Sequence, residues 1–454
     1  MHSNNNIGRW SWKYAVVKFL AKTYFYGFYR RIYVTGRENI PDGGRLIFAA
    51  NHQNALMDAL SVILTNKYQP VYLARADIFK NPLIAKILRF LKIMPVYRFR
   101  DGVGSMGQNE DTFEKTSEVL DSGGCIGIMP EGNHGDQLRL RTLKKGIFRI
   151  AFKAVEIYGT SLDVKIIPVG LCFSNRTKLF EELFINYGKP LPISGYLDLY
   201  SQHPQKGINA MKNDLSDSMK SLIVDIKDHA NYYNDKLLLD LGSPILRKKL
   251  SGLSSCSLNR FIVSKAFCQA MYEYFENDPV QAIALRSISG SLFELLEKNN
   301  IEPDSIEKLN TLSIFFTKTK ISLCYPVFIV GFMLHIIPVA IIKKMLGNLK
   351  DPQFICSFKF VLGLFLIPLN YILLAVLFFL NLSPAVAALL MAAVPLSGYW
   401  AYTCYSNSQK LKNKIHFYNK FREDRPVADH ILELRSQIIK EMEPVFQIAE
   451  IKLK

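Results

Sequence analysis

The sequence predicts an α/β domain followed by a helical region and a pair of long apolar helices, and three observations lead to this fold class. Between residues 38 and 174, short apolar runs alternate with helical patterns. From 193 to 312, apolar residues recur every three or four positions, as in amphipathic helices. Residues 360–409 contain no charged side chain. With 454 residues, the chain is long enough to bury a substantial core without disulfides or metals.

Residues 1–37 are predicted to contain an amphipathic helix that lies at a membrane interface. The stretch WSWKYAVVKFLAKTYFYGFYRRIYV combines aromatic side chains with lysines and arginines, a mixture typical of helices in the lipid headgroup layer. An ordinary amphipathic helix that packs on its own domain is the alternative. The first residues lack the basic, apolar and cleavage regions of a signal peptide, so we expect the domain that follows to stay in the cytosol.

Residues 38–192 are predicted to form the α/β domain. The expected strands are four short apolar runs, at 46–49, 71–73, 125–129 and 165–171. Helical patterns lie between them at 81–91 and 110–120. Such alternation is the sequence signature of a sheet with helices packed against it.

Residues 193–320 are predicted to be a helical region, and apolar segments follow it. Residues 357–405 should form a transmembrane hairpin, because each half has roughly the 20 residues that a helix needs to cross a bilayer. The turn residues at 381–384 divide the two halves. A buried hairpin in a soluble core is the alternative.

The apolar segment at 321–342 is predicted to re-enter the membrane or to lie at its surface. If it crossed, the lysines that follow it and those that follow the hairpin would lie outside the cytosol, against the positive-inside tendency. If it returns, all these lysines are cytosolic. Residues 410–454 are then expected to form a cytosolic C-terminal helix.

Charge and composition narrow the class of partner. The formal net charge of +17 favours a polyanionic partner: nucleic acid, an anionic membrane surface or a phosphorylated substrate. An aromatic content of 12% and a slightly positive mean hydropathy favour membrane lipids, and no nucleic acid is expected. The seven cysteines are scattered and never spaced as Cys-x-x-Cys, so we expect reduced, mostly buried thiols.

Four short motifs follow one another in the predicted α/β domain. They are NHQNALMD at 51–58, MPVYRFRD at 94–101, IMPEGNHG at 128–135 and IIPVGL at 166–171. In this order they resemble the four sequence blocks of the PlsC-like glycerolipid acyltransferases, among them the glycerol-3-phosphate, dihydroxyacetone-phosphate and 1-acylglycerol-3-phosphate O-acyltransferases. The resemblance covers residues 38–175 and implies an α/β acyltransferase domain with a mixed sheet flanked by helices. The apolar hairpin, preceded by LKDPQFICSFKFVLGLFLIPL, further resembles the fungal glycerol-3-phosphate and dihydroxyacetone-phosphate acyltransferases.

His52 and Asp58, in the first motif, are the predicted catalytic pair. A hydroxyl that attacks a thioester must lose its proton, and a neutral imidazole with a pKa of about 6.5 can take it near neutral pH. A carboxylate bonded to the other ring nitrogen would fix the tautomer and stabilise the imidazolium. The family has four residues between the two, whereas this chain has five. Neither spacing places both on one face of a regular helix, so we expect the pair to straddle a strand-to-helix turn, with Asn54 capping the helix that begins near Ala55.

The third motif departs from the family at a position that the resemblance links to phosphate binding. The family has an arginine after Glu-Gly-Thr, but this chain has Asn133 and His134 after Glu131-Gly132. Other cations must then hold a phosphate, and charge-assisted hydrogen bonds from arginine or lysine suit that task. The predicted substrate-binding residues are Arg98, Arg100, Glu131, Gly132, Asn133, Lys144 and Lys145, with Arg98 and Lys145 preferred, whereas Arg139 and Arg141 could equally form a basic face toward lipid.

The combined prediction is a membrane-bound O-acyltransferase. It would move a fatty acyl group from acyl-CoA or acyl carrier protein to a hydroxyl of glycerol 3-phosphate or a related glycerol-phosphate lipid, in phospholipid biosynthesis. The alternatives are an acyltransferase for 1-acylglycerol 3-phosphate or another lysophospholipid and, in a different class, a non-catalytic lipid-binding membrane module. The protein is expected to be integral to the membrane, with the catalytic domain on the cytosolic face (the inner or plasma membrane in a bacterium). No cofactor is expected, and no metal, because Glu131, His134 and Asp136 match no zinc-ligand spacing.

Overall fold

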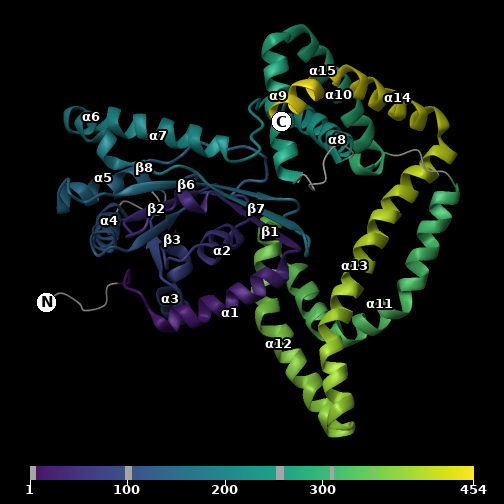
Figure 1. The fold of residues 1–454 in the computed structure, drawn as a ribbon, viewed down its shortest axis with the longest axis horizontal. Helices are drawn as coiled ribbons and strands as arrows, with labels where there is room; N and C mark the ends of the chain where they lie inside the picture. The colour runs from purple at the N-terminus through teal and green to yellow at the C-terminus, as the bar shows by residue number, and fades with distance from the viewer. Residues whose placement is uncertain (1–6, 98–104, 252–259, 307–310, 350, 454) are drawn as a thin grey trace. The chain divides into compact units, whose positions relative to one another are not determined.

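The computed structural model describes residues 7–97, 105–251, 260–306, 311–349 and 351–453 (Figure 1). The chain divides into two compact units. The first comprises residues 1–225 together with 349–361, and the second comprises 226–348 together with 362–454. We call residues 349–361 the returning segment, because the chain rejoins the first unit there.

The first unit is built on a mixed sheet. Within the described residues it has eight strands, in the order β1-β7-β6-β2-β5-β3-β4, with β8 paired to β6. β6 runs antiparallel to β7 and β8, and the other neighbours are parallel. The strands are β1 (Arg31–Thr35), β2 (Leu46–Ala50), β3 (Val71–Arg75), β4 (Ile93–Val96), β5 (Cys125–Ile128), β6 (Lys165–Phe173), β7 (Glu182–Tyr187) and β8 (Leu191–Pro192). This sheet confirms the predicted α/β fold.

The central strands are buried on both faces, and this burial explains the short apolar runs from which they were predicted. Every residue of β2 is buried, as expected for a parallel strand covered by helices on either side. β2 pairs in parallel with β5, and Ala49 lies opposite Ile128 at the ends of the two strands. Parallel strands end at the same edge of a sheet, so the first and third sequence motifs, which follow β2 and β5, are brought together.

Helices cover both sides of this sheet, with α6 and α7 on one side and α1, α2 and α3 on the other (Figure 1). The helices are α1 (Trp12–Phe28), α2 (Leu56–Thr65), α3 (Pro82–Phe90), α4 (Ser105–Asp121), α5 (Gly146–Tyr158), α6 (Leu197–Gln202) and α7 (Pro204–Ser221). The first unit therefore extends past the predicted boundary at residue 192. The chain after α7 approaches β6 closely: a Cβ at Gly170 would lie 2.4 Å from the carbonyl oxygen of Leu222.

The N-terminal helix ends earlier than the aromatic and basic stretch that predicted it. α1 stops at Phe28, and residues 31–35 form β1, whose β-branched and aromatic side chains suit an edge strand paired with β7. Phe25 and Phe28 are buried, whereas Trp12 is 62% and Phe19 67% exposed. The helix thus packs on its own domain with one face and presents apolar side chains with another.

The second unit consists of helices in its described residues. They are α8 (Tyr232–Ser251), α9 (Arg260–Asn277), α10 (Pro279–Lys298), α11 (Thr311–Leu346), most of α12 (Ile355–Asn381), α13 (Pro384–Glu423), α14 (Arg425–Glu441) and α15 (Glu443–Leu453). Residues 410–454, predicted as one helix, contain the end of α13 and two further helices. The side chain of Asp424 accepts a hydrogen bond from the Val427 N–H, so it caps α14 and separates it from α13.

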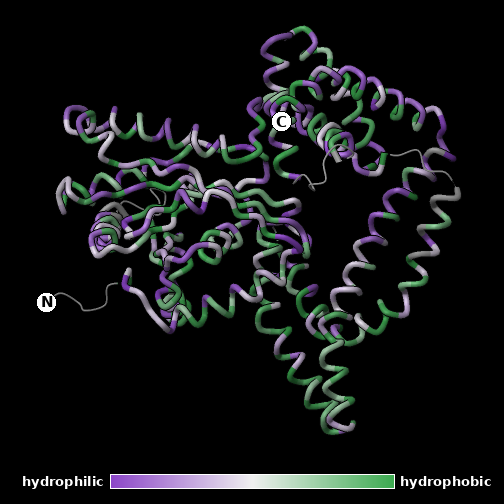
Figure 2. Tube along the Cα trace, in the orientation of Figure 1, coloured by the Kyte–Doolittle hydropathy of each residue, from purple (hydrophilic) through white to green (hydrophobic). Residues whose placement is uncertain are grey.

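Within the described residues, three helices are long and apolar enough to cross a membrane, by length and composition (Figure 2). They are Ile321–Leu346, Pro352–Asn381 and Pro384–Lys420, and the last two lie on either side of the turn predicted at 381–384. The segment at 321–342, predicted to re-enter the membrane or to lie at its surface, belongs to α11 (Thr311–Leu346). α11 is one continuous helix of 36 residues, and neither Pro326 nor Pro338 interrupts it. A continuous helix of this length is compatible with a helix that crosses the membrane and with one that lies at its surface.

Candidate active site

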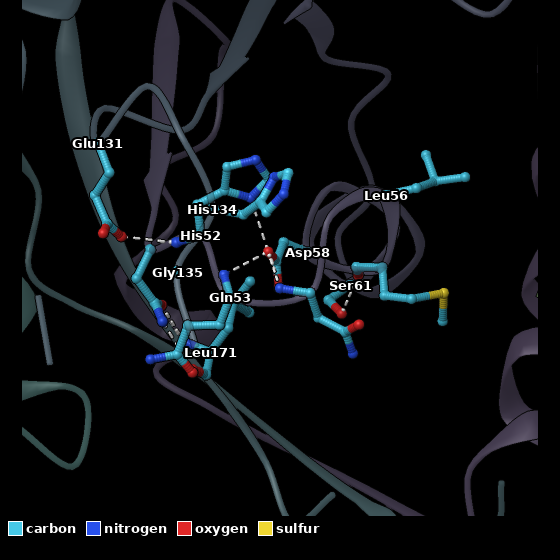
Figure 3. Close-up of polar contacts among 12 residues, drawn as sticks. His52, Gln53, Leu56, Asp58, Ser61, Glu131, His134, Gly135 and Leu171 are labelled. Atoms are coloured by element: carbon cyan, nitrogen blue, oxygen red, sulfur yellow. Dashed lines mark hydrogen bonds and ion pairs between the residues drawn. The ribbon is translucent and has the colours of Figure 1, made fainter. Parts of the chain in front are cut away.

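The first motif forms the loop between β2 and α2 and the first turn of α2 (Figure 3). Asn51, directly after β2, exchanges two hydrogen bonds with Leu171 of β6. Its Nδ2 donates to the Leu171 carbonyl at 3.0 Å, and its Oδ1 accepts from the Leu171 N–H at 2.7 Å. Asn51 is fully buried, so these bonds satisfy a polar side chain that water does not reach. The loop is therefore fixed to the sheet immediately before His52.

His52 and Asp58 meet across this loop (Figure 3). His52 Nδ1 lies 2.8 Å from Asp58 Oδ2, and the same oxygen accepts hydrogen bonds from the N–H groups of Gln53 at 2.8 Å and Asn54 at 2.7 Å. The Asp58 side chain is fully buried, whereas 19% of the His52 side chain is exposed. Because Nδ1 faces a carboxylate, it carries the proton, and Nε2 is left as the nitrogen that can accept one. The pair straddles the strand-to-helix turn, as its spacing predicted.

The start of α2 differs from the prediction that Asn54 caps it. The helix begins at Leu56, its N-cap position is Ala55, and no side chain of the N-cap residue bonds to the helix. The carboxylate of Asp58, in the first turn, reaches back to the N–H groups before the helix and replaces the predicted cap. The Leu56 N–H donates to Ser357 Oγ of the returning segment at 3.2 Å, which satisfies one of the free N–H groups at this helix end.

Glu131 of the third motif holds the backbone of His52. Its Oε1 accepts from the His52 N–H at 2.7 Å, and its Oε2 accepts from Arg141 Nε at 2.8 Å. The Gly135 N–H donates to the His52 carbonyl at 3.0 Å. Burial raises the pKa of Glu131, and the hydrogen bonds from His52 and Arg141 act against that shift. The third motif thus fixes the His52 backbone, while Asp58 fixes the ring.

A second histidine–carboxylate pair lies beside the first. His134 Nε2 lies 2.8 Å from Oδ2 of Asp351, which belongs to the returning segment. The rings of His134 and His52 pack edge to face, with centroids 5.4 Å apart at 87°. On another side the His134 ring packs against Phe354, with centroids 5.0 Å apart. The hydrogen bond from His134 lowers the pKa of Asp351.

The region that contains the two histidine–carboxylate pairs' histidines matches a known protein family. Residues 31–172 match the family model described as Acyltransferase. These residues are an acyltransferase domain. The matched range runs from β1 to β6 and contains His52, Asp58, Glu131 and His134. It confirms the family resemblance that the four motifs predicted.

Relatives of the acyltransferase domain cover different shares of the chain. Glycerol-3-phosphate O-acyltransferase 2 of Saccharomyces cerevisiae is 24% identical over 292 residues, which are 59% of this chain and 38% of the relative. The 1-acyl-sn-glycerol-3-phosphate acyltransferase of Borreliella burgdorferi is 29% identical over 195 residues, which are 43% of this chain and 69% of the relative. The crystal structure of the 1-acyl-sn-glycerophosphate acyltransferase PlsC from Thermotoga maritima is 21% identical, with a TM-score of 0.32, and the match covers 44% of this chain and 79% of that one. The chain thus spans less than half the length of the yeast relative it matches.

Four predicted substrate-binding residues lie around the third motif of the acyltransferase domain. Gly132 has a φ of 75°, a left-handed conformation that favours glycine, and Asn133 beside it is exposed. The Lys144 N–H donates to the Pro130 carbonyl at 2.7 Å, which closes the loop between the two residues. A Cβ at Gly132 would lie 3.3 Å from Lys144 Cγ, so this side chain passes next to the loop. Lys145 is half-buried at the start of α5.

The structure shows where two of the arginines considered for this region lie. Arg141, a candidate for a lipid-facing surface, has its side chain turned to buried Glu131 instead, because that carboxylate needs a charged partner. Arg139 is half-buried in the stretch before α5. Arg98 and Arg100 lie outside the described residues.

Two side chains of this arrangement, those of His134 and Asp351, have no predicted role in substrate binding or catalysis. His134 stood out as a departure from the family motif and as one of three metal-capable side chains that match no zinc-ligand spacing. Asp351 lies 217 positions further along the chain, so no local spacing connects the two. The stretch LKDPQF directly before α12 resembled the family and was the signal that could have drawn attention to Asp351.

Proposed function

We propose that this chain is a membrane-bound O-acyltransferase that transfers a fatty acyl group from a thioester, acyl-CoA or acyl carrier protein, to a hydroxyl of glycerol 3-phosphate or a related glycerol-phosphate lipid. The observation that carries the proposal is the contact of 2.8 Å between His52 and Asp58 inside an acyltransferase domain. The yeast relative, which is named a glycerol-3-phosphate O-acyltransferase, supports this class of acceptor. The resulting product would enter phospholipid synthesis.

His52 acts as the general base in this proposal. Its Nε2 accepts the proton of the acceptor hydroxyl as the hydroxyl oxygen bonds to the thioester carbonyl carbon. The Asp58 carboxylate, 2.8 Å from Nδ1, stabilises the imidazolium that forms. When the tetrahedral intermediate collapses, the carbon–sulfur bond breaks and the imidazolium returns the proton to the leaving thiolate. An ester and a free thiol form, without a covalent acyl-enzyme.

Glu131 supports the base and does not replace it. One of its carboxylate oxygens accepts the His52 N–H, and the other accepts Arg141 Nε. Both oxygens are therefore occupied by groups that hold the loop in place, whereas His52 Nε2 has no such bond and can accept a proton from a substrate.

Exposed apolar surfaces support a place at the membrane. Only 11–17% of the most apolar stretch of each candidate span is buried. Apolar surface left in water is unfavourable by about 25 cal/mol per Å², so these helices are suited to a lipid environment. In the first unit, Phe19 of α1 and Leu83 of α3 are 67% and 68% exposed. We propose that the catalytic domain lies on the cytosolic face, where a soluble thioester donor can meet a lipid acceptor.

A second candidate acceptor is 1-acylglycerol 3-phosphate or another lysophospholipid. The observation that favours it is the Borreliella relative, which is named for 1-acyl-sn-glycerol 3-phosphate and is 29% identical over 195 residues. The same base would serve, because both acceptors present a hydroxyl near a phosphate.

An acceptor panel tests the proposal. Purified protein in phospholipid vesicles is given labelled acyl-CoA or acyl carrier protein together with glycerol 3-phosphate, dihydroxyacetone phosphate, 1-acylglycerol 3-phosphate or no acceptor. We expect a labelled ester with glycerol 3-phosphate. Labelling of 1-acylglycerol 3-phosphate alone would favour the second candidate. Binding of lipid without transfer to any acceptor would overturn the enzyme proposal in favour of a lipid-binding membrane module.

A further inference from the structure

The chain reaches the start of α11 without passing through a candidate span. Among the described residues, the first of the three candidate spans begins at Ile321, inside α11 itself. Residues 226–310 follow directly on residue 225, the last residue of the first unit before α11. Because a chain changes sides of a membrane only in a span, α11 starts on the side of the first unit.

The end of α11 leads back to the same side. The returning segment, which follows α11, belongs to the first unit. Ser357 Oγ accepts the N–H of Leu56 of α2 at 3.2 Å. Phe360 is 2% exposed, and its ring packs on three aromatic side chains of α1 with centroids 5.1 to 6.0 Å away. A single helix with both ends on one side of a membrane does not cross it.

The other two candidate spans form a pair that brings the chain back to the side it left. α12 starts in the returning segment, and α15, after α13, packs on α9. Phe446 of α15 is fully buried, and its ring centroid lies 5.6 Å from that of Phe267 of α9. α12 and α13 therefore cross together or not at all. A further crossing by α11 would separate segments that pack together.

The uncharged part of α11 has no polar face for water. Its less exposed positions recur every three or four residues and form one stripe: Cys324, Phe328, Gly331, His335 and Pro338. On the rest of the surface, Leu323, Met333 and Ile337 are 56–75% exposed. A helix that lies at a membrane surface needs a polar face toward water. The exposed side chains of this helix are mostly apolar, so they suit the acyl chains of lipids.

The stripe packs closely against α13. A Cβ at Gly331 would overlap the backbone carbonyl oxygen of Ser397, and a Cβ at Gly398 would lie 2.8 Å from the His335 ring. The two helices thus approach one another at positions where only glycine fits. Small residues at such contacts are typical of helices that pack together in membranes.

His335 links α11 to α12 at the same level. Its Nδ1 lies 2.8 Å from the Gly331 carbonyl oxygen and so carries the proton, while its Nε2, 3.2 Å from the Tyr371 hydroxyl of α12, accepts the O–H. Asn370, next to it in α12, is 5% exposed and donates from Nδ2 to the Leu334 carbonyl at 3.0 Å. Both nitrogens of a neutral imidazole are satisfied in this way, as apolar surroundings require.

We propose that α11 is a membrane helix that does not cross: it lies among the acyl chains of the leaflet next to the first unit, and His335 fixes it to α12 and α13. Pro326 and Pro338 lie inside α11. Proline within a helix removes a backbone hydrogen bond and bends the helix, so α11 can enter the leaflet and leave it on the same side. The inference rests on the proposed place at the membrane and not on the proposed chemistry.

Native lysines test this topology without any substitution. Four exposed lysines report on the first unit, the end of α10 and the end of α11: Lys189, Lys298, Lys343 and Lys344. Sealed right-side-out and inverted vesicles that contain the full-length protein are treated with a membrane-impermeant amine reagent, and labelled peptides are quantified by mass spectrometry. We expect all four lysines to be labelled in one vesicle type and protected in the other until detergent opens it.

A different labelling pattern would overturn the proposal. If α11 crosses, Lys343 and Lys344 are labelled in the vesicle type in which Lys298 is protected. Protection of Lys343 and Lys344 in both vesicle types would also contradict a helix that returns to the headgroup layer. Labelling of Lys189 and Lys298 from different sides would remove the argument for where α11 starts.

Variants of the His335 contact test how the helix is held. His335→Leu keeps an apolar side chain but loses both hydrogen bonds, and Tyr371→Phe loses only the hydroxyl. We expect each to lower the Tm of the purified protein by a few degrees. The double variant should be no less stable than His335→Leu, because the hydroxyl has already lost its partner. Thr403→Val is the control: it removes a hydroxyl that donates to the Tyr399 carbonyl within α13, and Tm should stay within about a degree.

The outcomes separate the role of His335 from the topology and from catalysis. An unchanged Tm in both His335→Leu and Tyr371→Phe would overturn the role of His335, even if the lysines are labelled as expected. Additive losses in the double variant would overturn it as well, because the two side chains would then act independently. Neither measurement needs acyl transfer, so an inactive protein that is labelled as expected would refute the proposed function and leave this inference intact.

Discussion

The two histidine–carboxylate pairs of the acyltransferase domain differ in how they are built. His52, in the loop after β2, and Asp58, in the first turn of α2, are six positions apart, whereas His134 and Asp351 are 217 positions apart. Asp58 is fully buried, but 41% of the Asp351 side chain is exposed. A local and buried pair is preorganised by the strand and helix that carry it, while a remote and exposed pair depends on how a second segment packs. The first arrangement suits a base, whose ring must keep one orientation.

Replacing Asp58 with Asn should have the largest effect, because it disturbs the buried pair. Asp58 Oδ2 accepts three hydrogen bonds, from the His52 ring and from two backbone N–H groups. An amide brings N–H donors into this cluster of donors, so the ring loses its orientation and tautomer. We expect kcat to fall by about 10²- to 10⁴-fold in steady-state assays. A kcat within tenfold of wild type would show that the buried pair is not the catalytic one.

Replacing Glu131 should have the second-largest effect, because Glu131 contacts the base only through the His52 backbone N–H. Glu131→Ala leaves the His52 N–H and Arg141 Nε without their acceptor, and an unpaired buried donor costs about 1–3 kcal/mol. We therefore expect a ten- to hundredfold loss of kcat/KM, together with a lower Tm. Glu131→Gln keeps an acceptor oxygen and should lose less. Equal losses in both variants would mean that the negative charge, and not the support of the loop, is what matters.

Ser357→Ala should have the smallest effect and tests how independent the two pairs are. It removes the hydroxyl that accepts the Leu56 N–H from the returning segment. Loss of a helix cap typically costs about 1 kcal/mol, so Tm should fall by a few degrees in a thermal melt. The three bonds to Asp58 remain, and kcat should stay within about twofold. Ser357→Thr, which retains a hydroxyl, is the control. A drop in kcat comparable with that of Asp58→Asn would show that the returning segment also governs the base.

The same difference explains how much could be predicted from sequence. β2, β5 and β6 were predicted because strands buried on both faces are continuous apolar runs. The contact between His52 and Asp58 was predicted because both residues stand in one motif, and the loop only had to fold the chain back once. Local patterns sufficed for these parts.

The parts that were missed depend on contacts between distant segments. β1 follows an aromatic, basic helix without a turn signal, and only its pairing with β7 makes residues 31–35 a strand. Asp351 directly precedes an apolar stretch whose sequence predicts a membrane helix. Its place at the site is decided by packing further along, above all by the burial of Phe360 against α1.

Acyl transfer by His52→Ala tests the proposed base most directly. The variant and wild type are assayed in the same vesicles with the same labelled donor and acceptor, at matched amounts of folded protein. We predict a rate about two to four orders of magnitude lower in the variant, because it lacks the imidazole nitrogen that accepts the proton of the attacking hydroxyl. Transfer at a rate close to that of wild type would contradict the role of His52, and with it the proposed mechanism.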